Sequence, residues 1–206
     1  MALDAPEATD AADAIRDAGD GRVADERFRR RAAVVIGIMA MLLAISGLGG
    51  SNATKEMLNA NIQASDAYAF YQAKNIRQTS DQLAADQLEA MLLTQPDLPE
   101  DMRAQLQSRI EGYKATVARY ESDPSTGEGK QELLLKALDY EQRRDRAARQ
   151  DPNFDSAQAL FQIGIVLGSV SIVAVSRRLL LLGIILGALA TLLMLNGYFL
   201  LLPNLL

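Results

Sequence analysis

The sequence predicts an all-α membrane protein with three membrane-spanning helices and a helical domain outside the membrane between the first and second of them. Three apolar runs without charged residues support this fold class, at residues 32–50, 157–176 and 179–202. Each run is long enough to cross a hydrocarbon core about 30 Å thick as an α-helix. Residues 1–31 and 51–156 hold almost all charged side chains and the three runs hold none, which is the division that a bilayer imposes.

These runs divide the chain into five predicted segments. They are a mobile tail rich in Ala and Asp at 1–21, a basic flank with the first span at 22–50, an extramembrane helical domain at 51–156, the second span at 157–176, and the third span with the C-terminus at 179–206. The tail is expected to be mobile because it is too polar to bury a core.

Proline positions predict the helices of the extramembrane domain. No proline occurs between residues 22 and 95, so one helix is expected to leave the membrane and continue to Pro96. A third extramembrane helix is expected at 131–150, ending before Asp151-Pro152. The second helix carries an apolar stripe with spacings of 4, 4, 3, 4 and 3 residues, which indicates packing along another helix in a hairpin or coiled coil. The stripe consists of Met102, Leu106, Ile110, Tyr113, Val117 and Tyr120.

Basic residues predict the orientation of the spans. Arg29, Arg30 and Arg31 precede the first span, and Arg177-Arg178 form the expected turn between the last two spans. Three spans place both groups on the same side of the membrane, which the positive-inside rule makes the cytoplasmic side. The N-terminus is therefore expected in the cytoplasm, and the helical domain on the opposite side.

Residues 57–73 differ from an ordinary solvated helix because they include a single charged residue, Asp66. Two interpretations remain open for this polar helix. It could pack closely against other helices near the membrane surface, in a homo-oligomer or within the chain, or it could line an aqueous pathway or bind a small polar ligand. The candidate residues are Asn59, Asn61, Gln63, Asp66, Tyr68, Tyr71 and Gln72.

Small residues predict close helix packing within the membrane. Gly164 and Gly168 in the second span, and Gly183 and Gly187 in the third, each match the small-xxx-small pattern. The pattern favours a tight hairpin or an oligomer seam. No span contains an ionisable residue, which argues against ion-coupled transport.

Composition lowers the expectation of an enzyme. The chain has no Cys and no His, which removes thiolate chemistry, the commonest general base and the commonest transition-metal ligand. Its net charge of −5 argues against binding to nucleic acid. We therefore predict no catalytic residue, no metal site and no cofactor.

Several short motifs resemble the membrane-protein family designated domain of unknown function 4337. They are residues 52–56, Asn61, residues 63–66 and residues 71–78, followed by Phe154-Asp155 just before the second span and Asn196-Gly197 near the end of the third. The resemblance covers most of residues 30–202. It implies a helical protein of the bacterial cytoplasmic membrane, so that the domain at 51–156 would be periplasmic. It implies no activity.

These observations favour a non-enzymatic, self-associating inner-membrane protein that serves as a scaffold or accessory subunit of an envelope complex. Its expected partners are the lipid bilayer, further copies of the chain and other membrane proteins. One alternative is an oligomeric channel or transporter subunit whose polar helix 57–73 lines a vestibule. Another is a sensor that acts through a partner, since no output domain is expected after the last span.

Overall fold

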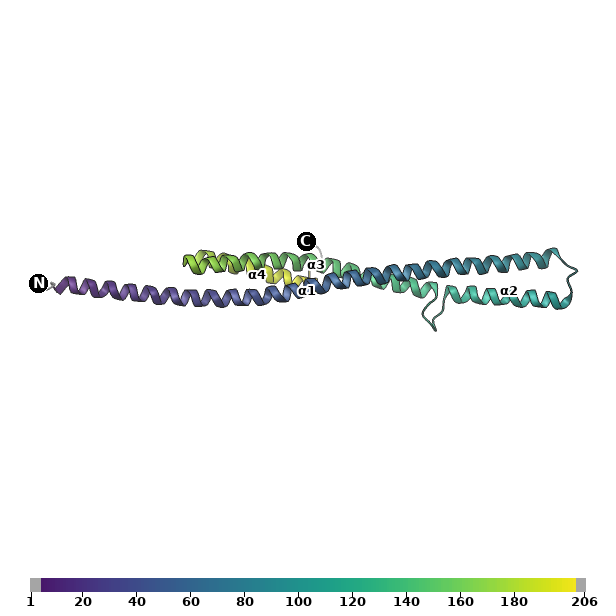
Figure 1. The fold of residues 1–206 in the computed structure, drawn as a ribbon, viewed down its shortest axis with the longest axis horizontal. Coiled ribbons are helices and arrows are strands. Elements are labelled where there is room, and N and C mark those ends of the chain that lie inside the picture. Colours follow the sequence, from purple (N-terminus) through teal and green to yellow (C-terminus); the bar gives the residue numbers. More distant parts are fainter. Residues whose placement is uncertain (1–4, 203–206) are drawn as a thin grey trace. The chain divides into compact units, whose positions relative to one another are not determined.

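The computed structural model describes the backbone of residues 5–202 and the side chains of residues 22–202. It contains four helices, which are α1 (Ala5–Thr94), α2 (Glu100–Glu121), α3 (Lys130–Ala174) and α4 (Arg177–Phe199) (Figure 1). No strand occurs among the described residues, so the all-α prediction is confirmed for them. The side chains of the predicted tail at 1–21 lie outside the described residues, as do residues 203–206 of the predicted 179–206 segment.

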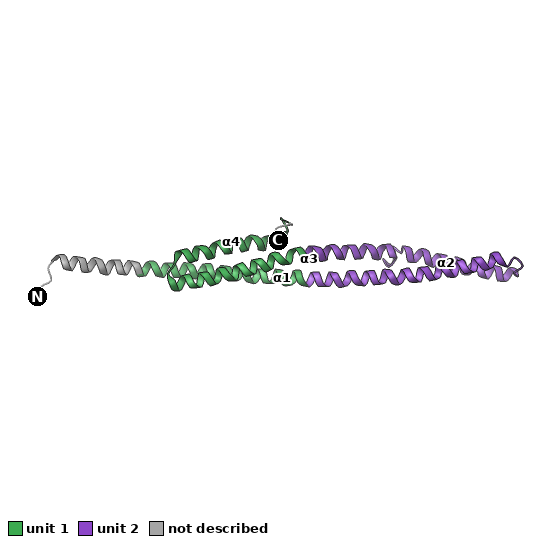
Figure 2. Cartoon of the chain, turned by 90° about the horizontal axis from the view of Figure 1, so that it is seen from above, with its two compact units in different colours: residues 1–54, 148–206 green, residues 55–147 purple. Residues whose placement is uncertain are grey.

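The chain forms two compact units, coloured separately in Figure 2. Unit 1 combines residues 1–54 with residues 148–206, and unit 2 comprises residues 55–147. The boundaries fall within α1 and α3. Unit 1 therefore contains the three predicted spans, and unit 2 contains most of the predicted extramembrane domain.

Helix α1 confirms the single long helix that the absence of proline predicts. It passes through Gly49-Gly50 without interruption and ends at Thr94, two residues before Pro96. The residue preceding a proline is disfavoured in the α conformation, so the helix cannot easily continue through Gln95. The Thr94 hydroxyl donates to the carbonyl of Ala90 at 2.9 Å, which supports the last turn.

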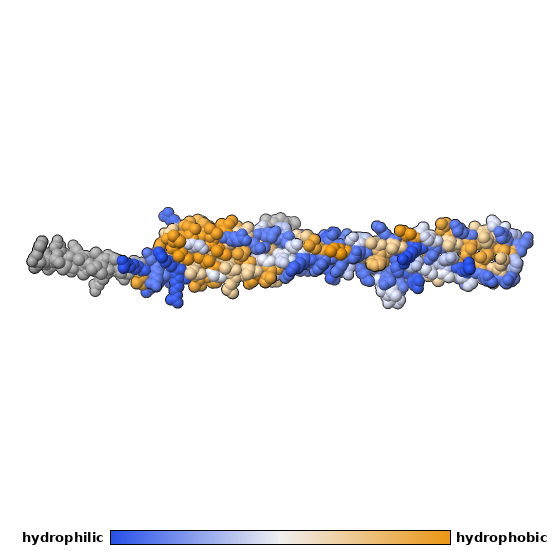
Figure 3. All heavy atoms as spheres, viewed as in Figure 1, coloured by the Kyte–Doolittle hydropathy of each residue, from blue (hydrophilic) through white to orange (hydrophobic). Residues whose placement is uncertain are grey.

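Unit 1 contains three helices that are long and apolar enough to cross a membrane. At most 33% of the most apolar window of each helix is buried within the chain, so large apolar side chains remain exposed around the unit. Figure 3 shows this apolar surface in orange over much of the visible face of the unit, with white and blue patches among the orange atoms. The buried core is small, and it consists of Met39, Ala53, Phe154, Ala157, Phe161, Ala190, Leu193 and Met194.

The ring of Phe154 fills the space between two glycines of unit 1. A Cβ at Gly49 on α1 would lie 2.5 Å from Phe154 Cε1, and one at Gly197 on α4 would lie 2.9 Å from the same atom. The Tyr198 ring packs edge-on at 4.9 Å, and the Ser46 hydroxyl donates to the Phe154 carbonyl at 3.3 Å. Phe154 on α3 thus contacts both other helices of the unit.

The prediction that Asp151-Pro152 ends a helix is wrong, because α3 continues through Pro152 to Ala174. Pro152 cannot donate to the carbonyl of Ala148, and proline in a helix interior costs about 3 kcal/mol. Packing on the C-terminal side offsets this cost, since Asn153 and Phe154 are buried in unit 1. The amide of Asn153 also donates to the carbonyl of Arg149 at 2.9 Å.

The expected turn at Arg177-Arg178 also needs correction, because both arginines belong to the first turn of α4. Val175 and Ser176 make the connection instead. Val175 adopts a left-handed conformation with φ 47°, and the Ser176 N–H donates to the carbonyl of Ser171 at 3.1 Å. This is the hydrogen bond that commonly closes a helix C-terminus, here with a β-branched residue at the position glycine prefers.

In unit 2, α1 packs antiparallel against α2 and then against α3. Glu89 pairs with Lys114 near the α1–α2 connection, and Gln78 contacts Val117 and Glu121 further along. One series of protected positions on α1, which we call the inner seam, alternates spacings of four and three residues. They are Ala60, Ala64, Ala67, Tyr71, Lys74, Gln78, Asp81, Ala85, Leu88 and Leu92.

The partner helices protect residues with the same alternation. The predicted α2 stripe lies on this protected side: Ile110 is buried, and Leu106, Tyr113, Val117 and Tyr120 are half-buried, whereas Met102 is 51% exposed. On α3, the buried residues of unit 2 are Leu133, Ala137 and Ala147. Alanine on both sides allows the α1 and α3 backbones to approach closely, because interaxial distance follows side-chain size at the contact.

Candidate functional site

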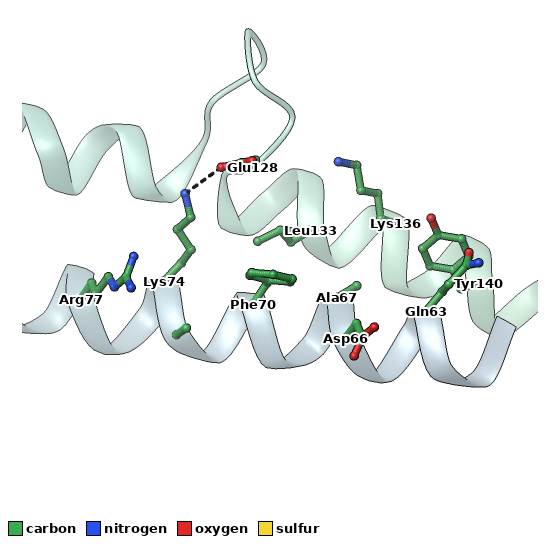
Figure 4. Close-up of a pocket in the computed structure, with 11 residues that line it drawn as sticks. Gln63, Asp66, Ala67, Phe70, Lys74, Arg77, Glu128, Leu133, Lys136 and Tyr140 are labelled. Atoms are coloured by element: carbon green, nitrogen blue, oxygen red, sulfur yellow. Dashed lines mark ion pairs between the residues drawn. The ribbon is translucent and has the colours of Figure 1, made fainter. Parts of the chain in front are cut away.

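A pocket of about 460 Å³ lies in unit 2 where residues 122–129 separate α2 from α3. Figure 4 shows Phe70 of α1 opposite Leu133 of α3, with Lys74 reaching toward Glu128 of the connecting loop. Phe70 is 63% exposed, so the pocket presents an aromatic surface to solvent. The pocket is lined by Gln63, Asp66, Ala67, Phe70, Ala73, Lys74, Arg77, Glu128, Leu133, Lys136 and Tyr140.

Charged groups of both signs surround this aromatic surface. Lys74 Nζ lies 3.7 Å from Glu128 Oε2, and Lys136 Nζ donates to the carbonyl of Gly127 at 2.7 Å. The described residues include no group of three or more His, Cys, Asp or Glu that could hold a metal ion. The lining is suited to non-covalent contact with a polar or aromatic group of a partner.

A polar network beside the pocket attaches the α2–α3 break to α1. Lys130 Nζ donates to Gln78 Oε1 at 2.8 Å and to Glu121 Oε2 at 3.2 Å, and it lies 5.5 Å from the Tyr71 ring centroid. Gln78 Nε2 donates to the carbonyl of Val117 at 3.1 Å and to Glu121 Oε2 at 3.0 Å. The bonds from Gln78 and then Lys130 hold the pKa of Glu121 below its ordinary value.

Glu132 holds the loop between the two helices in place. Its Oε1 accepts from the Ser122 hydroxyl at 2.6 Å, and its Oε2 accepts from the Asp123 N–H at 3.2 Å. The Ser122 bond is the main reason that the pKa of Glu132 lies below its ordinary value. Gly129 packs against Ser122 and Asp123 so closely that a Cβ would collide with their backbone.

The structure does not bring the predicted polar residues of helix 57–73 onto one face. Gln63 and Asp66 line the pocket, and Tyr71 lies in the inner seam. Tyr68 is half-buried, and burial together with the nearby Glu141 carboxylate raises its pKa. The other predicted residues are exposed, namely Asn59, Asn61 and Gln72.

A second stripe on α1 was not predicted as a stripe, and only Gln72 of its residues is among the sequence-based candidates. It repeats the four-and-three spacing of the inner seam two residues earlier, so it lies about 200° around the helix, on its opposite side. All of its residues are exposed and none is charged. This outer stripe consists of Leu58, Ile62, Ser65, Ala69, Gln72, Ile76, Thr79 and Leu83. Only the regular spacing of its apolar residues could have revealed the stripe in the sequence. Uncharged polar residues lie between these apolar residues and make the spacing hard to recognise.

The predicted membrane glycines lie within unit 1. A Cβ at Gly183 on α4 would lie 2.9 Å from the Gly164 carbonyl on α3, so these two backbones touch. Gly168 faces Ile36 of α1, and Gly187 faces Met39 of α1. The four glycines thus contribute to packing among the three helices of the same chain.

The predicted orientation residues are exposed at one end of unit 1. Arg29, Arg30 and Arg31 lie on α1 before its apolar stretch, and Arg177 and Arg178 begin α4. Among the described residues, none of these five arginines forms an ion pair. Asp25 and Glu26 lie one turn before Arg29 and Arg30 on α1, but the arginines outnumber these described carboxylates, so this end of the unit carries net positive charge.

These features define an all-helical protein in which three helices are long and apolar enough to span a membrane. A helical hairpin lies between the first and second apolar stretches in the sequence. Residues 28–200 match the family described as Domain of unknown function (DUF4337), so the chain belongs to that family. No curated protein and no solved structure matches the chain.

Proposed function

We propose that this protein spans the bacterial inner membrane three times and self-associates through unit 2 as a non-enzymatic scaffold. In this proposal unit 2 is an antiparallel coiled coil on the periplasmic side, and the arginines at the ends of the first and third spans face the cytoplasm. The apolar surface of unit 1 and the net positive charge at one of its ends support that placement.

The outer stripe of α1 is the observation that carries the proposal of self-association. Ile62 and Ile76 are 57% and 67% exposed, although large apolar residues on a solvated helix are normally scattered. The stripe alternates spacings of four and three residues over its whole length, as a helix does when it packs along another helix. The chain's own α2 and α3 occupy the opposite side of α1, so the stripe is left for another helix.

A second copy of the chain suits this stripe better than an unrelated helix. Copies inserted in one membrane share an orientation, so a two-fold axis along the membrane normal brings each residue to the height of its own counterpart. Like charges facing each other would repel, and the stripe contains none. Leu58, Ile62, Ile76 and Leu83 can then form self-matching apolar layers.

The chain's lack of cysteine permits a direct test by single-cysteine cross-linking in native membranes. Ile62→Cys and Ile76→Cys place thiols on the outer stripe, and we expect each variant to form a disulfide-linked dimer on mild oxidation. Gln63→Cys and Arg77→Cys are matched controls, because each is exposed and adjacent to a test position but rotated by about 100° around α1. We expect several-fold less dimer from these controls.

Equal cross-linking of test and control positions would show random collision and defeat the proposal. A charge exchange provides independent evidence. Ile76→Lys should disrupt the dimer when expressed alone, and co-expression with Ile76→Asp should restore it, because opposite charges would then face each other. If the co-expressed Ile76→Lys and Ile76→Asp chains do not form the dimer, residue 76 of one copy does not contact residue 76 of the other.

The alternative role as a channel subunit lacks a comparable observation. Gln63 and Asp66 lie on one flank of α1, whereas Asn61 and Tyr68 lie on the other, so their polar groups do not line a common surface on this helix. A scaffold needs only a self-associating stem and an accessible contact site. The pocket around Phe70 offers such a site in unit 2.

A further inference from the structure

A basic groove in unit 1 lies between the start of the apolar stretch of α1 and the start of α4. Its volume is about 500 Å³. Arg27 and Arg31 are one turn apart on α1, and Arg177 is the first residue of α4. Its apolar part is formed by Ala24, Phe28, Leu180, Leu181 and Ile184. The groove therefore combines cations from two helices with an apolar wall.

The three arginines of the groove have no described acidic partner. No Asp or Glu among the described side chains lies within ion-pair distance of Arg27, Arg31 or Arg177. Asp25 and Glu26 precede them on α1, are exposed, and form no ion pair with a described residue either. Three like charges gathered around one groove favour an anionic occupant.

The start of α4 adds a second reason to expect an anion. Ser176 occupies the N-cap position without a side-chain cap, which leaves the first backbone N–H groups of α4 available. The helix dipole makes this end positive, so Arg177 and Arg178 stand where a cation is unfavourable. A bound anion would compensate both the dipole and the arginines.

The apolar wall distinguishes a lipid from a small anion. Leu181 and Ile184 are 58% and 40% exposed, and they continue into the most apolar part of α4. In Figure 3, hydrophilic atoms at this end of unit 1 adjoin the apolar surface directly. A ligand with a negative headgroup and an acyl chain would contact the arginines and this wall simultaneously.

We propose that this groove binds an anionic phospholipid, with the phosphate between Arg27, Arg31 and Arg177 and an acyl chain along Leu181 and Ile184. The proposal rests on the membrane insertion of unit 1 proposed above. Guanidinium groups bind phosphate oxygens through paired hydrogen bonds, and basic clusters beside a span attract anionic headgroups. Zwitterionic phospholipids lack the net charge that the groove would neutralise.

The test uses the full chain reconstituted in phosphatidylcholine vesicles that contain phosphatidylglycerol as the anionic probe. Preference for phosphatidylglycerol over phosphatidylcholine is measured with spin-labelled lipids. Replacing all three groove residues, as Arg27→Gln, Arg31→Gln and Arg177→Gln together, is expected to lower this preference by about tenfold. The matched control replaces Arg29, Arg30 and Arg178 with Gln, which removes equal charge from the same end and leaves the groove intact.

Equal loss in both triple variants would show diffuse attraction to the whole basic end and overturn the proposal. Full displacement by soluble glycerol phosphate would show a small-anion site without an acyl contribution, and would also overturn it. Flotation of the chain with carbonate-washed vesicles is checked first. A chain that does not float refutes membrane insertion itself, whereas a floating chain without lipid preference refutes only the lipid site.

Discussion

Asn196 Nδ2 donates a hydrogen bond to Asn153 Oδ1 at 2.9 Å, linking α4 to α3 at the end of the apolar bundle. Both amides are buried, and both are otherwise satisfied. Asn153 donates to the carbonyl of Arg149 at 2.9 Å, and Asn196 exchanges hydrogen bonds with the backbone N–H and carbonyl of Leu202 at 2.8 and 3.1 Å. This amide pair fixes the depth of α4 relative to α3 and ties down the residues after α4.

Removing one member of the amide pair leaves a buried polar group on the other. Asn153→Ala and Asn196→Ala should each destabilise the detergent-solubilised full chain by about 1–3 kcal/mol, with the larger effect at Asn196 because it also holds Leu202. Thermal unfolding of both single variants and the double variant measures the pair directly. The double variant should lose less than the sum of the singles, and strict additivity would show that the pair does not couple.

The contacts of Phe154 predict that two glycines cannot accept a methyl group. Gly49→Ala and Gly197→Ala should each lower stability by about 1–3 kcal/mol, because the new Cβ would overlap the Phe154 ring. Gly37→Ala on the same helix as Gly49 is the control, since its Cβ would meet nothing within 4 Å. It should be neutral or stabilising by about 0.5–1 kcal/mol.

The same prediction can be checked by rescue. Phe154→Leu removes the ring and should be destabilising alone, but it should reduce the additional cost of Gly49→Ala. An unchanged cost in the Phe154→Leu background would mean that the glycine acts through something other than this ring.

The left-handed conformation of Val175 predicts a stabilising substitution. A non-glycine residue in the left-handed region destabilises the folded state by about 1–2 kcal/mol, and glycine avoids that cost. Glycine also gives the unfolded chain more conformational freedom, which offsets part of the gain. Val175→Gly should therefore raise the unfolding temperature modestly. Val173→Gly is the control, because it places the same substitution within α3 at an exposed site and should lower the unfolding temperature.

The carboxylates around residues 122–129 predict a loss of local stability in acid. Hydrogen bonds from Ser122 to Glu132, from Ser125 and Thr126 to Asp123, and from Gln78 and Lys130 to Glu121 lower the pKa of each carboxyl group. A carboxyl group whose pKa is lowered by folding stabilises the folded state fully at pH values above its ordinary pKa, which is 4.5 for glutamate. This stabilisation is lost as the pH falls toward the lowered pKa. Hydrogen-exchange protection of this loop, corrected for intrinsic rates, should therefore decrease below about pH 4.5.

Substitution at Glu132 isolates its part of this pH response. Glu132→Gln keeps an acceptor for Ser122 but cannot titrate, so protection should be lower near neutral pH and should change less with acidification. Glu111→Gln on the exposed side of α2 is the matched control and should retain the wild-type profile. Identical profiles for wild type and Glu132→Gln would show that Glu132 does not hold the loop.

The elements that the sequence predicts well are those decided by local chemistry. The proline-free stretch predicts the length of α1, and the uncharged apolar runs predict the apolar stretches of α1, α3 and α4. Both predictions succeed because helix continuity and hydropathy depend on neighbouring residues. The α2 stripe is predicted for the same reason. The continuation of α3 through Pro152 is not, because the packing of Phe154 that offsets the proline involves α1 and α4, far away in the sequence.

The candidate surfaces were harder to predict. The unusual composition of helix 57–73 draws attention to its amides, but the buried residues of the inner seam in this stretch are Ala60, Ala64 and Ala67. Alanines are common in helices, so their role cannot be recognised from composition. The pocket depends on Glu128 and Lys136, which join Lys74 and Gln63 in its lining only after the chain has reversed direction. Pairing across a hairpin is information that helical spacing alone does not contain.

The five residues between α1 and α2, at 95–99, have a consequence for how the molecule acquires its structure. Such a short connection means that little conformational entropy is lost when α1 and α2 come together at this tip. Contact between the start of α3 and Gln78 closes a much longer stretch of chain and therefore loses more entropy. We expect the hairpin to nucleate at this tip, with Glu89 meeting Lys114, and to zip from there toward the alanines near residue 60. Pulsed labelling during refolding should therefore find α2 acquiring protection before α3.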